Sequence, residues 1–312
     1  MSRYVSLDDT EISEDTTMKR FAIKQLTALA LALVMTLSLC PVTAWADYAE
    51  PPSFGDTTTE ETHSHPTCGV TGCTSSTHGH NEVDVWTELT SVGSTLSEGS
   101  YYLGKDITVN STIAISGTVN LCLNGNTLSL ASGKTGSVIS VPVGATLNLC
   151  DCSNPSTGII TGGNARSEGG GIYVFGNLVI YGGTISGNYA GYEGGGVFVN
   201  GGGGTNVASF KMYGGSITNN SANNHAGGVY LSNCTATLSG TPVISGNTSG
   251  DGSLSYPVKA DNMYVYAYMS NGSYIPNADI TVGDLADGAS IGVGMTSPCT
   301  FTEGGADAKV WM

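Results

Sequence analysis

The chain has 312 residues, a formal net charge of −15 and only 11% charged residues, while 45 residues are glycine. The acidic balance excludes nucleic acid and anionic lipid as expected partners, because binding a phosphate backbone needs a basic face. So much glycine disfavours a helical protein, and so few charges disfavour a disordered acidic chain. Neutral, hydroxyl-rich and aromatic surfaces suit sugars or other proteins.

Residues 1–46 are predicted to be a signal peptide. Basic residues precede an apolar run over 26–40, and the run is followed by "TAWA", whose alanines have the A-x-A spacing of a cleavage site. Met18 is an alternative start, because the acidic stretch ahead of it is unusual for a signal. The apolar run is shorter than the ~20 residues of a bilayer span. We therefore expect an extracellular protein, secreted or associated with the cell surface, with no membrane span in the mature chain.

Residues 47–62 are rich in Pro, Thr and Glu without periodicity, which predicts a flexible linker. The segment 63–82 that follows gathers six ligand-type side chains, His63, His65, Cys68, Cys73, His78 and His80. Tetrahedral zinc needs four such ligands, so zinc is the one cofactor that we expect. A disulfide between Cys68 and Cys73 is the alternative.

Residues 83–255 are predicted to form a β-solenoid. Their short alternating strands are bounded by Gly, Asn or Ser, and none is long enough for a helix. An isoleucine ahead of an asparagine-bearing turn recurs at intervals of 25, 32 and 27 residues, at Ile160, Ile185, Ile217 and Ile244. Periods of this length predict one coil per repeat. We expect an all-β, right-handed parallel β-helix of roughly five to six coils, followed over 256–312 by a β-rich cap or a truncated continuation.

The offsets within each repeat support this fold. Three apolar positions keep their spacing between repeats, namely Leu178, Ile180 and Ile185, then Phe210, Met212 and Ile217. Side chains at i and i+2 share a strand face, so coils stacked ~4.8 Å apart align them into interior columns. The extra residues of the 32-residue interval lie in "NGGGGTNVAS", which predicts a loop at one corner.

The asparagines Asn188, Asn220 and Asn247 each follow the repeated isoleucine by three residues. Stacked at one corner, their amides can hydrogen-bond from coil to coil. The pattern therefore predicts an asparagine ladder with a structural role.

The motifs "GGI" with "ISGN" and "GGV" with "ITNN" resemble the GGA(I/L/V) and FxxN repeats of polymorphic outer-membrane-protein passengers, with isoleucine in place of phenylalanine. More broadly, residues 83–312 are similar to right-handed parallel β-helix proteins of the pectate-lyase-like superfamily. They are also similar to glycine-rich, adhesin-like surface proteins of Gram-positive gut bacteria. These motifs specify architecture rather than activity. From the sequence as a whole we expect a secreted, non-catalytic surface or adhesive module that binds extracellular glycans or host or neighbour proteins along an exposed face.

A polysaccharide-active lyase or hydrolase of that superfamily is the alternative function. Hydrolysis needs two carboxylates across a glycosidic bond, and elimination needs clustered carboxylates for Ca²⁺ together with a base. Between Leu121 and Val258 the carboxylates are widely spaced in sequence, namely Asp151, Glu168, Glu193 and Asp251. The sequence therefore assigns no catalytic residue and favours a binding module.

Aromatic residues are the candidate ligand-binding positions. Tyr173, Phe198 and Tyr230 occupy one register between inward-pointing aliphatic residues, and Tyr181 and Tyr213 form a second pair. All five are expected on the outer surface, where aromatic rings can stack on sugar rings. The alternative is that such pairs only stabilise the sheet.

Two cysteines share one register in adjacent coils. Cys122 and Cys150 each follow the sequence "NL", and stacking would place their Cα atoms ~4.8 Å apart, within disulfide range. They either form a disulfide or stack as small reduced hydrophobic residues. Cys152, Cys234 and Cys299 have no evident partner in the sequence.

Overall fold

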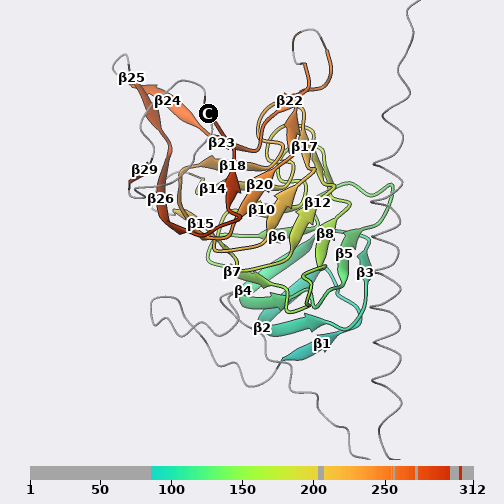
Figure 1. The fold of residues 1–312 in the computed structure, drawn as a ribbon. Coiled ribbons are helices and arrows are strands. Elements are labelled where there is room, and N and C mark those ends of the chain that lie inside the picture. Colours follow the sequence, from blue (N-terminus) through green and yellow to red (C-terminus); the bar gives the residue numbers. More distant parts are fainter. Residues whose placement is uncertain are drawn as a thin grey trace, which may run out of the picture. The chain divides into compact units, whose positions relative to one another are not determined.

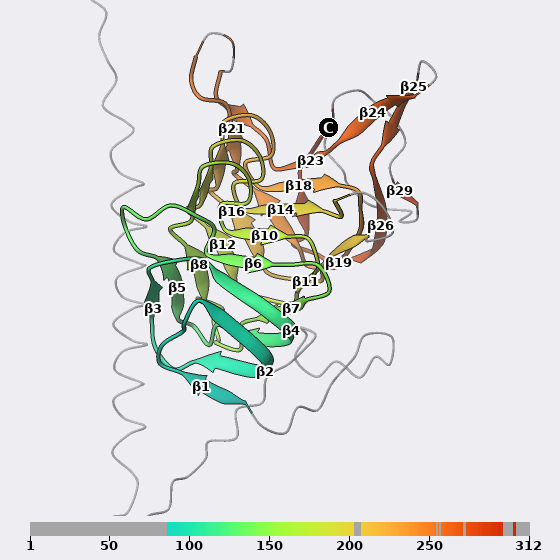
Figure 2. The same ribbon diagram turned by 180° about the vertical axis from the view of Figure 1, so that it is seen from behind.

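A computed structural model of the chain describes residues 86–202, 207–253, 255, 257–270, 273–295 and 302–303. Within these residues every regular element is a β-strand (Figures 1 and 2). No helix in these ranges has the length and apolar character needed to cross a membrane. The expected signal peptide, linker and Cys/His segment lie outside the described residues, and so does Cys299.

The largest sheet has 15 strands, which form two arms. The long strands β2 (Thr95–Leu103) and β4 (Ile113–Cys122) connect the arms, because β4 pairs with the first strand of each, and β1 (Thr87–Leu89) pairs with β2. The first arm comprises β6 (Ile139–Val141), β10 (Ile172–Val174), β14 (Val197–Asn200), β18 (Val229–Ser232), β23 (Met263–Val265) and β28 (Val293–Met295). The second comprises β7 (Thr146–Cys150), β11 (Asn177–Ile180), β15 (Ala208–Met212), β19 (Cys234–Gly240), β26 (Ala278–Leu285) and β29 (Thr302–Glu303).

Two smaller sheets complete the coils. The seven-stranded sheet takes one parallel strand from each of seven successive coils: β3 (Ile107–Val109), β5 (Thr127–Leu130), β8 (Ile159–Thr161), β12 (Thr184–Ser186), β16 (Ser216–Thr218), β20 (Val243–Ser245) and β27 (Ser290–Ile291). The five-stranded sheet contains β9 (Asn164–Ala165), β13 (Tyr189–Ala190), β17 (Ser221–Ala222), β21 (Thr248–Ser249) and the antiparallel β22 (Lys259–Ala260).

The chain therefore winds as a parallel β-helix, which confirms the predicted fold class. One coil runs through β10, β11, β12 and β13, and the next runs through β14, β15, β16 and β17, strand beside strand (Figures 1 and 2). The extra residues of the 32-residue interval lie between β14 and β15, which are separated by seven residues where β10 and β11 are separated by two. The described residues form seven coils where five to six were expected, because parallel pairing continues beyond residue 255, through β23, β26 and β27.

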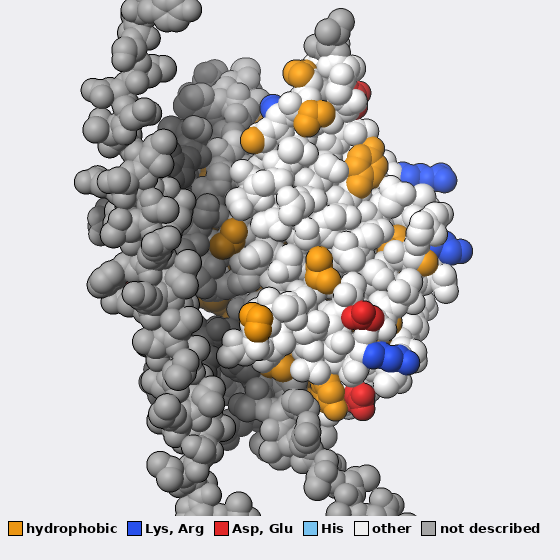
Figure 3. All heavy atoms as spheres, turned by 45° about the vertical axis from the view of Figure 1, so that its right-hand side comes forward, with side chains coloured by type: hydrophobic (Ala, Val, Ile, Leu, Met, Phe, Trp, Pro, Cys, Tyr) orange, Lys and Arg blue, Asp and Glu red, His pale blue; other side chains and the backbone are white. Residues whose placement is uncertain are grey.

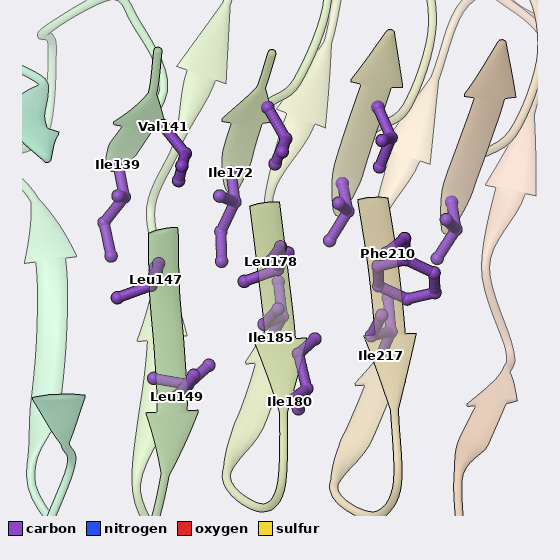
Figure 4. Close-up of a cluster of buried hydrophobic side chains, with 14 of the residues drawn as sticks. Ile139, Val141, Leu147, Leu149, Ile172, Leu178, Ile180, Ile185, Phe210 and Ile217 are labelled. Carbon is purple, nitrogen blue, oxygen red and sulfur yellow. The ribbon is translucent and has the colours of Figure 1, made fainter. Parts of the chain in front are cut away.

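The predicted apolar columns fill the interior. Leu147, Leu178 and Phe210 are register partners in three successive coils and are fully buried, and Ile185 pairs in the same way with Ile217 (Figure 4). Each such side chain is buried by the coils above and below it as well as by the opposite sheet. The core is therefore continuous along the solenoid, and no single coil could form it.

The predicted asparagine ladder lies at the corner between the seven-stranded and five-stranded sheets. The Asn188 Nδ2 donates to Asn220 Oδ1 at 3.0 Å, and the Asn220 Nδ2 donates to Asn247 Oδ1 at 3.0 Å. Asn262 extends the ladder by one coil, because its Oδ1 accepts from Asn247 Nδ2 at 3.2 Å. The first three asparagines are at most 1% exposed. Their side chains thus satisfy backbone groups that the tight corners bury.

The strands after β22 add one irregularity to the solenoid. An antiparallel hairpin, β24 (Ala267–Ser270) with β25 (Ser273–Pro276), is inserted between β23 and β26, and it projects from the stacked coils in both ribbon views (Figures 1 and 2). After the hairpin, β26 returns to the register of β19. The hairpin is therefore an insertion at one corner of a coil.

Candidate functional site

The candidate site is the outer face of the second arm together with the part of β4 that pairs with it. It consists of the side chains that point away from the core on β4, β7, β11, β15 and β19. On β7 the side chains of Leu147 and Leu149 are buried, while those of Thr146 and Asn148 alternate with them and are partly exposed. Strand pairing places one such residue per coil in each row. The two rows are Thr118–Thr146–Asn177–Ser209–Thr235 and Asn120–Asn148–Val179–Lys211–Thr237.

Hydrogen bonds between coils hold these side chains in place. The Asn148 Nδ2 donates to Asn120 Oδ1 at 2.8 Å, and the Asn120 Nδ2 donates to Ser100 Oγ at 2.8 Å. In the neighbouring row, the Ser209 hydroxyl donates to Asn177 Oδ1 at 2.7 Å. A side-chain amide has two N–H donors and a carbonyl acceptor, so each asparagine amide of the outer face retains hydrogen-bonding capacity toward solvent.

A stacked tyrosine pair forms one edge of this face. Tyr181 and Tyr213 directly follow β11 and β15, and their rings stack with centroids 5.5 Å apart and an interplanar angle of 20°. Both are half-buried, and burial raises the pKa of the Tyr213 hydroxyl. The predicted pairing of these two residues is therefore present. In the preceding coils the same row holds Cys122 and Cys150.

The other predicted aromatic column is formed, but most of it is buried, and only Tyr173 is half-buried. Tyr173, Phe198, Tyr230 and Tyr264 stack in successive coils, with centroid separations of 5.5, 5.2 and 5.7 Å. Phe198 and Tyr230 are each only 5% exposed, so the expectation that they lie on the open surface was wrong.

Glycine-rich loops explain this burial. Gly169 and Gly194 have positive φ angles of 67° and 66°, and a Cβ on Gly194 would come within 2.9 Å of the Phe198 Cβ. A Cβ on Gly169 would come equally close to the ring of Tyr173. These glycines let the chain fold back against the aromatic rings at the point where it enters the next coil. Strand alternation does place the rings away from the core, but it carries no information about the loop that covers them.

Glu193 and His225 lie beside the buried aromatic column. The sequence pattern did not predict that these two residues would be neighbours. They form a parallel bridge between successive coils. Burial raises the pKa of the Glu193 carboxyl; the hydrogen bond from the Tyr230 hydroxyl opposes this effect, and the charge of Glu168 adds to it. The His225 ring stacks on Tyr264 at 4.3 Å, and burial lowers the pKa of this histidine. The buried His225 Nδ1 has no hydrogen-bond partner among the described residues.

The other two acidic positions have local structural roles. Burial opposes ionisation of Asp151, but hydrogen bonds from the Ser156 hydroxyl and from the Gly125, Gly158 and Ser153 backbone N–H groups outweigh it and lower the pKa of this carboxyl. The fully exposed Asp251 accepts hydrogen bonds from Ser253, which lower its pKa. Such hydrogen bonds stabilise turns, and both carboxylates act in this way here.

Cys122 and Cys150 are register partners, as their spacing predicted, and both are buried thiols in the structure. A disulfide between them stays a prediction. The Cys122 Sγ also lies 3.3 Å from the Sγ of Cys152, a contact that the sequence did not indicate. Zinc binding by the N-terminal Cys/His segment is likewise untested. Within the described residues, no group of three or more His, Cys, Asp or Glu is arranged to hold a metal ion.

Comparison with known proteins adds no family to this description, since no family model, curated protein or solved structure matches the chain.

Proposed function

We propose that the chain is a secreted, non-catalytic surface module that binds neutral polysaccharides along the outer face of its second arm. The observation that supports this is the row-by-row alignment of hydroxyl and amide side chains on that face, with Tyr181 and Tyr213 stacked at its edge. The resemblance of the repeats to adhesin-like β-helix proteins agrees with such a role. So does the fold, in which each coil adds one residue to each row of the outer face.

The chemistry of the outer face favours sugars over charged ligands. Asn148, Asn177 and Ser209 offer neutral donors and acceptors at fixed spacing, which suit the hydroxyl groups of a sugar chain. The exposed edges of the two tyrosines offer apolar contact. Lys211 is the one charged residue in the two rows of this face. Figure 3 shows a different side of the molecule, the right-hand side of Figure 1 turned forward, and there too uncharged polar side chains and backbone predominate. The net charge of −15 disfavours nucleic acid and anionic polymers.

A binding screen with matched variants tests this proposal. The purified chain is applied to an array of polysaccharides and mucins, together with a variant that carries Asn148→Ala, Asn177→Ala, Tyr181→Ala and Tyr213→Ala. The control carries Thr161→Ala and Ser186→Ala on the outward side of β8 and β12. We expect the first variant to lose binding at least tenfold, because both hydrogen bonds and ring contacts are removed, and the control to bind like the parent chain.

Unchanged binding by the first variant would refute the assignment to this face, provided that circular dichroism shows an intact β fold. Equal losses in both variants would do the same, because they would indicate a site elsewhere or general unfolding. If the chain binds deglycosylated mucin protein and does not bind free glycans, the ligand is a protein and not a polysaccharide.

One observation supports a polysaccharide hydrolase as the second candidate. Glu193 has a raised pKa and lies close enough to Glu168 to feel its charge, and glycoside hydrolysis uses two neighbouring carboxyl groups, one of which has a raised pKa. Reducing-sugar release measured on the same polysaccharides separates the candidates. Release that is lost in Glu193→Gln would support the hydrolase, and absence of release would support the binding module.

A further inference from the structure

Three cysteines meet at the corner where β4 and β7 end. Cys122 and Cys150 are the last residues of these two strands, and Cys152 follows two residues after Cys150. Cys122 is fully buried, Cys150 is 4% exposed, and Cys152 is half-buried. The sequence pattern pairs Cys122 with Cys150, and the side chains of these two residues are hydrogen-bonded, but the Cys122 Sγ also lies 3.3 Å from the Sγ of Cys152.

Geometry favours the Cys122–Cys152 pair over the register pair. Registered residues in neighbouring parallel strands point the same way, so their Cβ atoms keep about the ~4.8 Å separation of the strands. A disulfide prefers a Cβ–Cβ separation of about 3.5–4.5 Å. Cys152 has already left the sheet, and its sulfur turns back toward Cys122. Closing the bond requires the two sulfurs to approach from 3.3 Å to about 2.05 Å, a small side-chain movement.

The surrounding loop holds Cys152 in this position. Asp151 Oδ1 accepts from the Gly125 N–H at 2.8 Å, and Asp151 Oδ2 accepts from the Gly158 N–H at 2.7 Å. The Cys152 thiol also donates to Asn124 Oδ1 at 3.3 Å. The anchored loop therefore holds the two sulfurs close together in the folded chain, and no further folding is required to bring them near each other.

We propose that Cys122 and Cys152 form a disulfide when the folded chain meets a disulfide-bonded oxidant such as oxidised glutathione. The half-buried Cys152 thiolate attacks one glutathione sulfur, which breaks the glutathione disulfide and releases one reduced glutathione. The Cys122 sulfur, after loss of its proton, then attacks Cys152 Sγ and releases the second glutathione as a thiol. Two protein thiols are oxidised by two electrons, and one glutathione disulfide is reduced to two thiols. This modification is independent of the proposed ligand.

Peptide mapping distinguishes the three cysteines. The full chain is incubated folded with oxidised glutathione, alkylated, denatured at acidic pH and digested with trypsin and an enzyme that cleaves before aspartate. Cleavage at Lys134, Asp151 and Arg166 leaves Cys122 in 106–134, Cys150 in 135–150 and Cys152 in 151–166. We expect peptide 106–134 linked to 151–166. The same link should persist in Cys150→Ser and disappear in Cys152→Ser.

Two further readouts keep the test decisive. The disulfide closes a loop of 30 residues, so oxidation should raise the Tm of the parent chain by roughly 10 °C, and this shift should be absent in Cys152→Ser. A link between 106–134 and 135–150 would overturn the proposal in favour of the register pair. Separate alkylation of Cys122 and Cys152 after oxidation would overturn it outright, whatever the behaviour of the variants.

Discussion

Asn220 lies in the middle of the buried asparagine ladder, where one side chain serves three coils. Its Nδ2 donates to Asn247 Oδ1 and to the Ile185 carbonyl, and its Oδ1 accepts from both the backbone N–H and the Nδ2 of Asn188. A buried polar group that loses its partner costs about 1–3 kcal/mol. Each ladder amide therefore contributes through the neighbouring groups that it satisfies.

The variant Asn220→Ala should accordingly lower the free energy of unfolding by about 3 kcal/mol or more, because it leaves several buried donors and acceptors unpaired at once. Chemical denaturation measures this value. The outward-facing Ser186→Ala is the control and should change stability by at most about 0.5 kcal/mol. A loss below about 1 kcal/mol for Asn220→Ala would contradict the ladder.

Glu193 gives the solenoid a pH dependence of known sign. Burial and the charge of Glu168 raise its folded-state pKa above the unfolded value, despite the opposing hydrogen bonds from Tyr230 and Asn224. The folded state then binds more protons than the unfolded state, so this group's contribution to stability is present at low pH. It is lost as pH rises from about 4.5 through the raised pKa.

We therefore predict that Glu193→Gln raises the Tm relative to the parent chain at pH 7 and that this difference shrinks or reverses at pH 4. Glutamine keeps an acceptor for the Tyr230 hydroxyl but carries no charge to bury. Calorimetry at the two pH values measures the difference. A Tm difference that is the same at both values would show that Glu193 titrates normally.

At the scale of the strands, the core depends on residues of adjacent coils having complementary sizes. Phe210 on β15 is fully buried between its register partners Leu178 and Ala236. Because the next coil offers only the small Ala236, no neighbouring side chain can fill the space that the ring occupies. The cavity left by a smaller residue would therefore persist.

The variant Phe210→Ala should lose about 3–5 kcal/mol of stability. Lys211→Ala is the matched control, since Lys211 is the next residue of the same strand and points outward; it should change stability by about 0.5 kcal/mol or less. Urea denaturation of the two variants gives both values. Similar losses would mean that β15 does not present alternate residues to the core.

At the scale of the whole molecule, the repeated motifs carried enough information to predict the coil. The recurrence of isoleucine before "GN" or "NN" predicted the column of Ile185, Ile217 and Ile244, and the separate recurrence of "NLC" predicted the register of Cys122 with Cys150. Asn262 was not predicted as a ladder member. Its coil lacks the repeated motif, so only the stacking of β23 on β18 places it there.

The chemistry of the surface was less predictable than the fold. Strand alternation correctly separated Tyr230 from the core, but its burial depends on how the loop that contains Ala226 packs, which a periodic pattern does not encode. The Glu193–His225 pair joins residues 32 positions apart in loops of neighbouring coils. Such contacts follow from coil stacking, so they become visible only when the register of every coil is known.

Distance measurements along one row of the seven-stranded sheet test the stacked-coil account most directly. Thr108, Ser129 and Ser245 belong to a single outward row with one residue per coil. Spin labels attached through a non-cysteine amino acid should lie about 19 Å apart for Ser129 with Ser245 and about 24 Å apart for Thr108 with Ser245, because each coil adds ~4.8 Å. Equal separations for the two pairs, or a broad spread that does not grow with the number of coils, would contradict the β-helix.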